Sequence, residues 1–186
     1  MTGRGVLEGA FALLEVLDAL GGRAGFAELV RAGDLPRTTT HRLLDQLTEL
    51  GAVERVPDGY RIGARVFRLG ESWEPELRAL ARDWLPVLSA RIRAPVLLAV
   101  RREERVLVVA AEGAGVRPGT TLPTDTAAAR VLAANRGYAA DPGSVAVPVR
   151  APGGAVIAAL AATPPPGRNP LTLVPGLAST ARALGA

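Results

Sequence analysis

One segment in the N-terminal third constrains the fold more than any other part of the chain. In LPRTTTHRLLDQLTELG, residues 35–51, apolar side chains recur at helical spacing, while the first turn carries three threonines, a histidine and an arginine. The stripe expected to be buried consists of Thr40, Leu43, Leu44, Leu47 and Leu50. Because β-branched residues are mediocre helix formers, their place at an exposed helix start indicates contact with a partner.

Two further helices precede this segment and a hairpin follows it. Residues 6–20 hold apolar side chains at helical spacing and end at a Gly-Gly pair, and a short helix over 25–31 ends at Gly33. Pro36 suits the start of the third helix, because its missing N–H would have no intrahelical partner there. After Gly51, the strands AVERV and YRIG flank a Pro-Asp-Gly turn. Three helices and a hairpin predict a winged helix-turn-helix.

In such a fold, the exposed start of the third helix enters the major groove of DNA. Hydroxyl and guanidinium groups there can reach phosphates or base edges, and a helix N-terminus attracts anions. The wing adds two arginines beside its tip, where the DNA backbone or minor groove would pass. The predicted DNA-binding residues are Arg37, Thr38, Thr39, His41, Arg42, Arg55 and Arg61.

Other interpretations of these residues remain open. Thr38 could serve as an N-cap, and a single exposed histidine is often an ordinary surface residue. Winged folds also serve as protein-interaction modules. A small-molecule sensor with a vestigial DNA head is a further alternative to a regulator that binds a specific sequence.

The rest of the chain predicts a helical connector and a small α+β domain. Helical periodicity over residues 64–92 is interrupted at Glu74-Pro75, and the remainder alternates strands and turns. The predicted elements are the hairpin PVLLAVRR and RVLVVAAEG, a helix over 126–134, the hairpin SVAVPVR and AVIAALAAT, and a final helix over 171–184. We therefore expect an α+β protein with two domains, residues 1–72 and 73–186.

Composition excludes several chemistries. The chain has no cysteine and one histidine, so it cannot by itself form disulfides, thiolate sites, a multi-histidine metal site or more than one catalytic His. We expect no enzyme activity, no cofactor and no metal. Apolar runs are interrupted by acids and too short to span a bilayer, so we expect a cytoplasmic protein that does not enter a membrane.

Charge alone does not locate a nucleic-acid domain. All 22 basic residues are arginine, the net charge is +4 and the isoelectric point is about 10.8, which fits an anionic partner. Yet residues 1–70 carry nine arginines and nine acids, so the net charge lies in the remainder.

The N-terminal residues resemble the IclR-type family of bacterial transcriptional regulators. The similarity runs through GVLEGAFALLEVLDAL and FAELVRAGDLPRTTTHRLLDQLTELGAVERVPDGYRIGARVFRLG, with Thr40 where the family usually has Val and a wing about one residue shorter. It continues through LRALARDWLPVLSARIRAPVLLAVRREERVLVVAAEG, LPTDTAAARVLAA and NRGYAADPGSVAVPVRAPGGAVIAALAAT. Between the last two pieces the family has several dozen more residues.

The resemblance implies a winged helix-turn-helix joined by a helical connector to a shortened GAF-like effector domain, in a homodimer or a dimer of dimers. It implies a repressor or activator that binds double-stranded DNA and responds to a small organic acid. Polar groups of the effector pocket would be Asp141, Ser144 and Thr163, with the backbone around Leu122 to Ala128 as another wall. The residues alone also fit a simple turn at Asp141-Pro142-Gly143 and ordinary strand ends at the other two positions.

Overall fold

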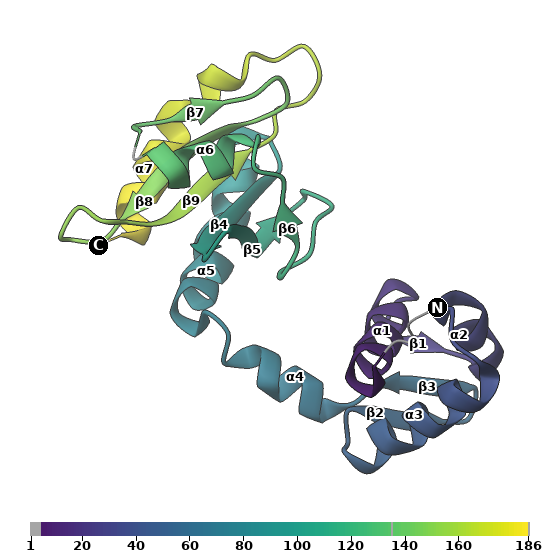
Figure 1. Cartoon of the computed structure of the whole chain (residues 1–186). Helices are drawn as coiled ribbons and strands as arrows, with labels where there is room; N and C mark the ends of the chain where they lie inside the picture. The colour runs from purple at the N-terminus through teal and green to yellow at the C-terminus, as the bar shows by residue number, and fades with distance from the viewer. Residues whose placement is uncertain (1–4, 135, 186) are drawn as a thin grey trace. The chain divides into compact units, whose positions relative to one another are not determined.

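The computed structural model describes residues 5–134 and 136–185, which divide into two compact units, Met1–Trp73 and Glu74–Ala186 (Figure 1). Each unit buries its own apolar side chains. Within these described ranges, none of the helices is both long and apolar enough to cross a membrane.

The N-terminal unit contains the expected three helices and hairpin. Its elements are α1 (Val6–Ala19), β1 (Arg23–Ala24), α2 (Phe26–Gly33), α3 (Arg37–Glu49), β2 (Val53–Val56), β3 (Gly59–Ile62) and α4 (Ala64–Glu71). The strands form an antiparallel sheet in the order β1-β3-β2. β1 was not expected from the sequence, because two residues are too few to show an alternating pattern.

A leucine-rich core holds α3 in place. Leu13 and Leu17 of α1 and Leu43 and Leu44 of α3 are fully or almost fully buried. Gly9 permits the close approach of α1, because a Cβ there would lie 2.9 Å from the Leu43 side chain. The expected burial of Leu50 is wrong: its side chain is 56% exposed, since it lies after the last residue of the helix.

The turn at the wing tip depends on glycine. Gly59 has a φ of +142°, and a Cβ at this position would lie 2.3 Å from the carbonyl oxygen of Ala24 in β1. β1 pairs with β3 through Arg23↔Arg61 and Ala24↔Tyr60. The wing is therefore packed directly against the strand that precedes α2.

The C-terminal unit is a six-stranded antiparallel sheet with three helices. Its elements are α5 (Pro75–Ile92), β4 (Val96–Arg102), β5 (Arg105–Glu112), β6 (Thr121–Leu122), α6 (Ala127–Ala134), β7 (Ala139–Ala140), β8 (Val145–Arg150), β9 (Val156–Ala162), a 3-10 turn (Pro170–Leu173) and α7 (Val174–Leu184). The strand order is β6-β5-β4-β9-β8-β7. The two expected hairpins are present and are joined into one sheet by the pairing of β4 with β9.

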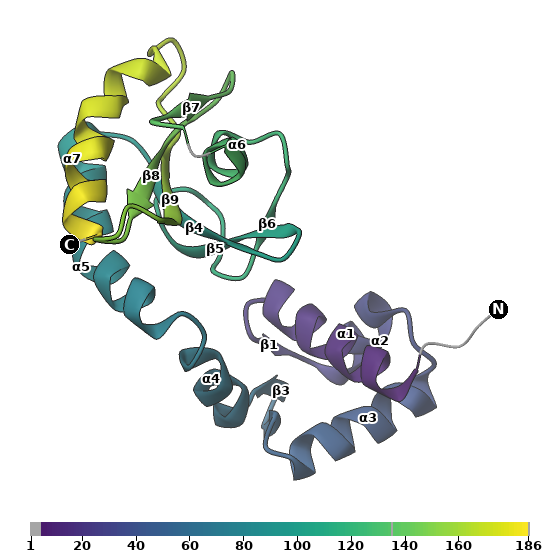
Figure 2. The same cartoon turned by 60° about the vertical axis from the view of Figure 1, so that its left-hand side comes forward.

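The helices cover opposite faces of this sheet. α5 and α7 pack side by side on one face, and α6 packs on the other (Figure 2). The side chains alternate accordingly: Ala159 and Ala161 of β9 belong to the cluster around α6, and Leu160 points the other way. The expected α+β class, with an N-terminal helix-turn-helix and an antiparallel C-terminal sheet, is confirmed.

Candidate functional site

The exposed face of α3 and the neighbouring wing form one polar surface, which we call the recognition surface. Burial of the leucines on one side of α3 forces the other side toward solvent. The recognition surface comprises Arg37, Thr38, Thr39, His41, Arg42, Asp45 and Arg55, of which Thr39 and Asp45 are half-buried and the others exposed. Six of the seven residues predicted to bind DNA lie on it, while Arg61 pairs with Glu54 on the opposite face of the hairpin from Arg55.

The first turn of α3 is not capped by a side chain. Pro36 is the N-cap residue and accepts the Thr40 N–H at 2.9 Å, while the Thr40 hydroxyl also donates to the Pro36 carbonyl at 3.2 Å. Capping by Thr38, one of the open interpretations, is not what the structure shows. The amide groups that open α3 therefore have no side-chain acceptor at the N-cap, and they carry the positive end of the helix dipole.

Arg42 is the most available cation of the recognition surface. Its side chain is exposed, and within the described residues it makes no hydrogen bond or ion pair. Arg37 instead lies over the ring of Phe26, with its guanidinium carbon 4.8 Å from the ring centroid. Arg42 is thus free to form the bidentate contact that guanine accepts in the major groove.

Asp45 connects the recognition helix to the wing. Its carboxylate lies 2.9 Å from Nδ1 of His41 and also pairs with the guanidinium of Arg55 on β2. Arg55 in turn lies over the ring of Tyr60, 5.7 Å from its centroid. Sequence reasoning missed Asp45 as a member of the site, although its spacing of four residues from His41 is the spacing at which helical side chains meet.

The other wing arginine has an internal partner of its own. Arg61 donates from Nε and Nη2 to one oxygen of Glu54, at 2.8 and 2.6 Å, and the Ala64 N–H donates to the other oxygen at 3.3 Å. The hydrogen bonds from Arg61 and Ala64 hold the pKa of Glu54 below its usual range. A phosphate that approached Arg61 would compete with this carboxylate.

The predicted effector residues do not form one cluster. Asp141 and Ser144 are in contact, and Thr163 lies one position beyond the Val145↔Ala162 pair, on the strand next to Ser144. Leu122 lies on β6, the opposite edge strand of the sheet, and pairs with Val106 of β5. The structure therefore brings together the three polar positions near the β8 end, and Ala127, from the predicted backbone wall, donates its N–H to Asp141. Leu122 packs against the apolar cluster around α6.

Asp141 is fully engaged in hydrogen bonds within the chain. Its Oδ2 accepts the Ala127 N–H at 2.8 Å and the Ser144 hydroxyl at 2.6 Å, and its Oδ1 accepts the N–H groups of Gly143 and Ser144 at 2.8 and 2.7 Å. Partial burial raises the pKa of Asp141, but these hydrogen bonds outweigh it and hold the pKa below its usual range. The carboxylate caps the start of α6.

α6 lies tightly against the sheet. Eight of the ten buried residues in the cluster around it are alanine, including Ala128 on the helix and Ala159 on β9. Small side chains on both surfaces let the backbones approach closely, as close-packed protein interiors require. The hollow beside Asp141, lined also by Asp125, Thr126, Arg130 and Pro142, measures only about 270 Å³.

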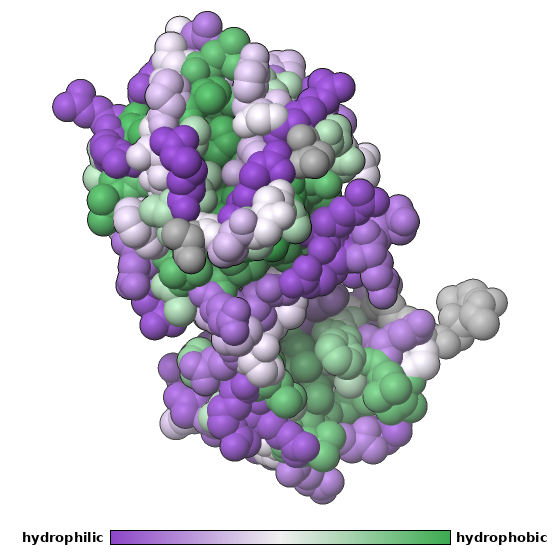
Figure 3. Space-filling model, turned by 90° about the vertical axis from the view of Figure 1, so that its left-hand side faces the viewer, coloured by the Kyte–Doolittle hydropathy of each residue, from purple (hydrophilic) through white to green (hydrophobic). Residues whose placement is uncertain are grey.

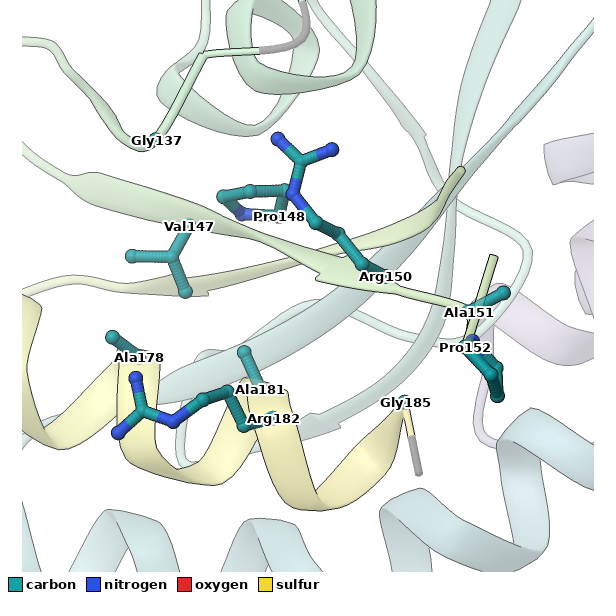
Figure 4. Close-up of a pocket in the computed structure, with 10 residues that line it drawn as sticks. All are labelled: Gly137, Val147, Pro148, Arg150, Ala151, Pro152, Ala178, Ala181, Arg182 and Gly185. Atoms are coloured by element: carbon teal, nitrogen blue, oxygen red, sulfur yellow. The ribbon is translucent and has the colours of Figure 1, made fainter. Parts of the chain in front are cut away.

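A larger groove lies on the other side of the unit, between β8 and α7. It measures about 470 Å³ and is lined by two arginines, Arg150 and Arg182, and by no acidic residue (Figure 4). Arg150 donates to the Gly154 carbonyl at 2.9 Å, and Arg182 lies along α7. None of the predicted effector residues lines this groove. Within the described residues, no group of His, Asp and Glu side chains is arranged to hold a metal ion.

Sequence comparison agrees with the geometry of the N-terminal unit, a winged helix-turn-helix whose recognition helix is open to solvent. Residues 6–57 match the IclR helix-turn-helix domain. A glycerol operon regulatory protein from Streptomyces coelicolor is 33% identical over 107 residues, which make up 55% of this chain and 42% of that protein. The matched region thus spans less than half of that relative, which is the longer of the two proteins.

Solved structures extend the similarity to both units. An IclR homolog from Microbacterium hydrocarbonoxydans, in complex with 4-hydroxybenzoate, has a TM-score of 0.79 at 23% identity and covers 97% of this chain and 98% of that chain. HmgR from Pseudomonas aeruginosa has a TM-score of 0.70 at 21% identity, covering 96% and 97%. At these identities the likeness concerns the fold. The sequence match thus concerns the N-terminal unit, and the structural similarity shows that both units have the fold of IclR-type proteins.

Proposed function

We propose that this protein is a DNA-binding transcriptional regulator that reads an operator with its recognition surface. The observation that carries the proposal is the open start of α3: no side chain caps the helix, and the Arg42 side chain in its second turn has no partner within the described residues. A helix start of this kind attracts phosphates, and an unpaired guanidinium can read guanine.

In this arrangement the first two turns of α3 would enter the major groove, and the wing would lie along the adjacent backbone. Arg42 and Thr38 project from the exposed side of α3 and would face base edges or phosphates. Arg61 would contact a phosphate after exchange of its Glu54 partner for the DNA backbone, and Arg55 would offer a phosphate the N–H groups that Asp45 does not engage.

The proposed regulator acts as a homodimer or a dimer of dimers, so that two recognition helices meet two half-sites. α1 leaves large apolar side chains in contact with solvent: Leu7 is 76% and Phe11 64% exposed. The space-filling view shows apolar residues gathered on the N-terminal unit (Figure 3). A contiguous apolar patch of this kind favours an interface with another protein surface. Phe11→Glu should therefore lower the molar mass measured by light scattering, while Glu15→Gln on the same helix should leave it unchanged.

The central experiment is selection of binding sites from a random DNA pool. Enrichment of a palindrome, with half-sites separated by about one helical turn or a multiple of it, would support both specific DNA binding and two-fold symmetry. Recovery of unrelated sequences, with affinity that depends only on salt, would contradict the proposal of a specific operator.

A response to a small organic acid is a second proposal. It rests on the solved relative that holds 4-hydroxybenzoate and on the two arginines, without an acid, that line the groove between β8 and α7. Titration calorimetry with 4-hydroxybenzoate should give saturable heat, and Arg182→Ala should reduce it. If millimolar 4-hydroxybenzoate gave only the heat of dilution, the proposal that the protein senses this class of acid would be wrong. The proposal that it binds DNA would be unaffected.

A further inference from the structure

Asp45 is an acidic residue in the middle of a surface that would face a polyanion. Its side chain lies on α3 between the His41 and Glu49 positions and is 39% exposed. A carboxylate at this position would repel phosphates, so its presence on the recognition surface calls for a physical reason. The reason is found in the contacts that it makes.

The carboxylate of Asp45 holds two cationic or polar groups from two different elements. One oxygen lies 2.9 Å from Nδ1 of His41, one turn earlier on α3. The other oxygen pairs with the guanidinium of Arg55, which comes from strand β2 of the wing. Exposed ion pairs of this kind add little to stability, so their effect is chiefly on where the side chains point.

His41 is fixed from two sides. The ring of Phe26 meets it edge-on, with centroids 5.8 Å apart and an interplanar angle of 74°, and the Asp45 carboxylate engages Nδ1. A carboxylate at Nδ1 keeps a proton on that nitrogen, so Nε2 is the ring atom left for DNA. The orientation of the imidazole is therefore set before DNA binds.

Arg55 is fixed in a similar way. Its guanidinium lies between the Asp45 carboxylate and the ring of Tyr60, whose own side chain is buried in the core of the unit. Because Arg55 belongs to the wing and His41 to α3, Asp45 links the two parts of the recognition surface that would bind to different parts of one DNA site.

We propose that Asp45 is a positioning residue for sequence recognition, which orients His41 Nε2 toward a base edge and fixes the distance between the wing and the recognition helix. This inference rests on the proposed DNA-binding function and deepens it. Asp45 acts through its neighbours and makes no direct contact with a base.

The proposal predicts an effect opposite in sign to simple electrostatics. Removal of a negative charge near DNA should by itself strengthen binding to every sequence. Removal of a positioning group should weaken binding to the operator relative to other DNA, because correctly placed base contacts are lost. Glu49 supplies the matched control: it is exposed on the same helix, carries the same charge, and makes no hydrogen bond or ion pair within the described residues.

The test uses the full chain and the sequence enriched by selection from a random pool. Dissociation constants are measured on that duplex and on a scrambled duplex for the unaltered protein, Asp45→Ala and Glu49→Ala, with thermal midpoints as a control for folding. We expect Glu49→Ala to tighten both complexes equally, and Asp45→Ala to lower the ratio of specific to scrambled affinity by about tenfold, a loss comparable to one base contact. His41→Ala with Asp45→Ala should lose little more specificity than His41→Ala alone, because coupled residues are non-additive.

The outcomes separate this inference from the proposed function. An enriched sequence together with an unchanged affinity ratio for Asp45→Ala, as for Glu49→Ala, would overturn the role of Asp45 and leave the regulator in place. An equal loss on both duplexes would make Asp45 a general contributor to binding and would also overturn the inference. Failure of the unaltered protein to enrich any sequence would remove the proposed function and the inference with it.

Discussion

α3 and α6 both begin beside polar residues, but they differ in which groups accept hydrogen bonds from the N–H groups of the first turn. At α6, the Ala127 N–H donates to Asp141 and the Ala129 N–H to the hydroxyl of Thr126. At α3, the N-cap residue is a proline with no side-chain acceptor. The positive end of one helix is neutralised within the chain, and that of the other is left for an external anion.

Ligands are accordingly expected at the start of α3 and not at the start of α6. The start of α6 is already capped by a carboxylate, so its role is structural. α6 also packs on alanines, which leave little space for a ligand beside it. At the start of α3 no side chain caps the helix, and the Arg42 side chain has no partner in the part of the chain that the structure describes, so both remain available to a ligand.

The largest effect should come from filling the tight contact of α6 with the sheet. Ala128 is 2% exposed, so Ala128→Leu should lower the free energy of unfolding by about 3 kcal/mol, the upper part of the range for overpacked cores. Denaturant unfolding would measure it, with Ala133→Leu on the exposed side of the same helix as the control. If Ala128→Leu were as stable as the unaltered protein, space would exist beside α6. The contrast between a closed α6 and an open α3 would then be wrong.

The next effect concerns the open helix. Arg42→Ala should weaken binding to the selected operator by about 2 kcal/mol and change binding to random DNA little, if the guanidinium reads a base. Fluorescence anisotropy on the two duplexes would measure both values. Equal losses would reassign Arg42 to a phosphate contact.

A smaller effect is expected at the capped helix. Asp141→Asn should cost about 1 kcal/mol of stability at neutral pH, because the charged acceptor of four hydrogen bonds is lost. The native pKa of Asp141 is lowered, so its contribution is present above the unfolded value of about 4 and is lost as the pH falls through the native pKa.

The difference in unfolding free energy between Asp141→Asn and the unaltered protein should accordingly narrow in acid. Asp125→Asn, at an exposed acid beside the same hollow, is the control and should show no such trend. A difference that stayed constant from neutral to strongly acidic pH would contradict the capping role of the ionised carboxylate.

The smallest effect should come from the wing. Arg61→Ala should reduce the slope of log affinity against log salt by at most about 0.9, the value of one phosphate contact. Glu54→Gln should act in the opposite direction, because it frees Arg61 from its carboxylate partner. Unchanged slopes in both variants would place the wing away from the DNA backbone.

Much of the N-terminal unit is predictable because its determinants are local. Leucine spacing located α3, and the Pro-Asp-Gly turn located the wing. The pairing of β1 with β3 and the contact between Asp45 and Arg55 were not predicted, since each joins residues from separate elements. The helical period shows that Asp45 faces solvent. It cannot show that the wing places Arg55 beside Asp45.

The C-terminal unit is less predictable for the same reason. Its strands follow from apolar runs, but the pairing of β4 with β9 joins segments about 60 residues apart in the sequence, and no local pattern specifies it. The expectation that Asp141 binds an effector stays a prediction. Asp141 caps α6 because it accepts the Ala127 N–H. This contact depends on how the chain folds back across the sheet, which no local sequence pattern shows.

The contact of Gly59 with Ala24 has a consequence for any attempt to transfer this winged helix-turn-helix into another protein. Since the hairpin tip fits against a carbonyl oxygen with no room for a methyl group, residues 23–25 and 57–61 make up a single exchangeable cassette. A chimera that takes a longer hairpin from another winged helix-turn-helix must take its docking strand as well, or the new tip will not pack against residues 23–25.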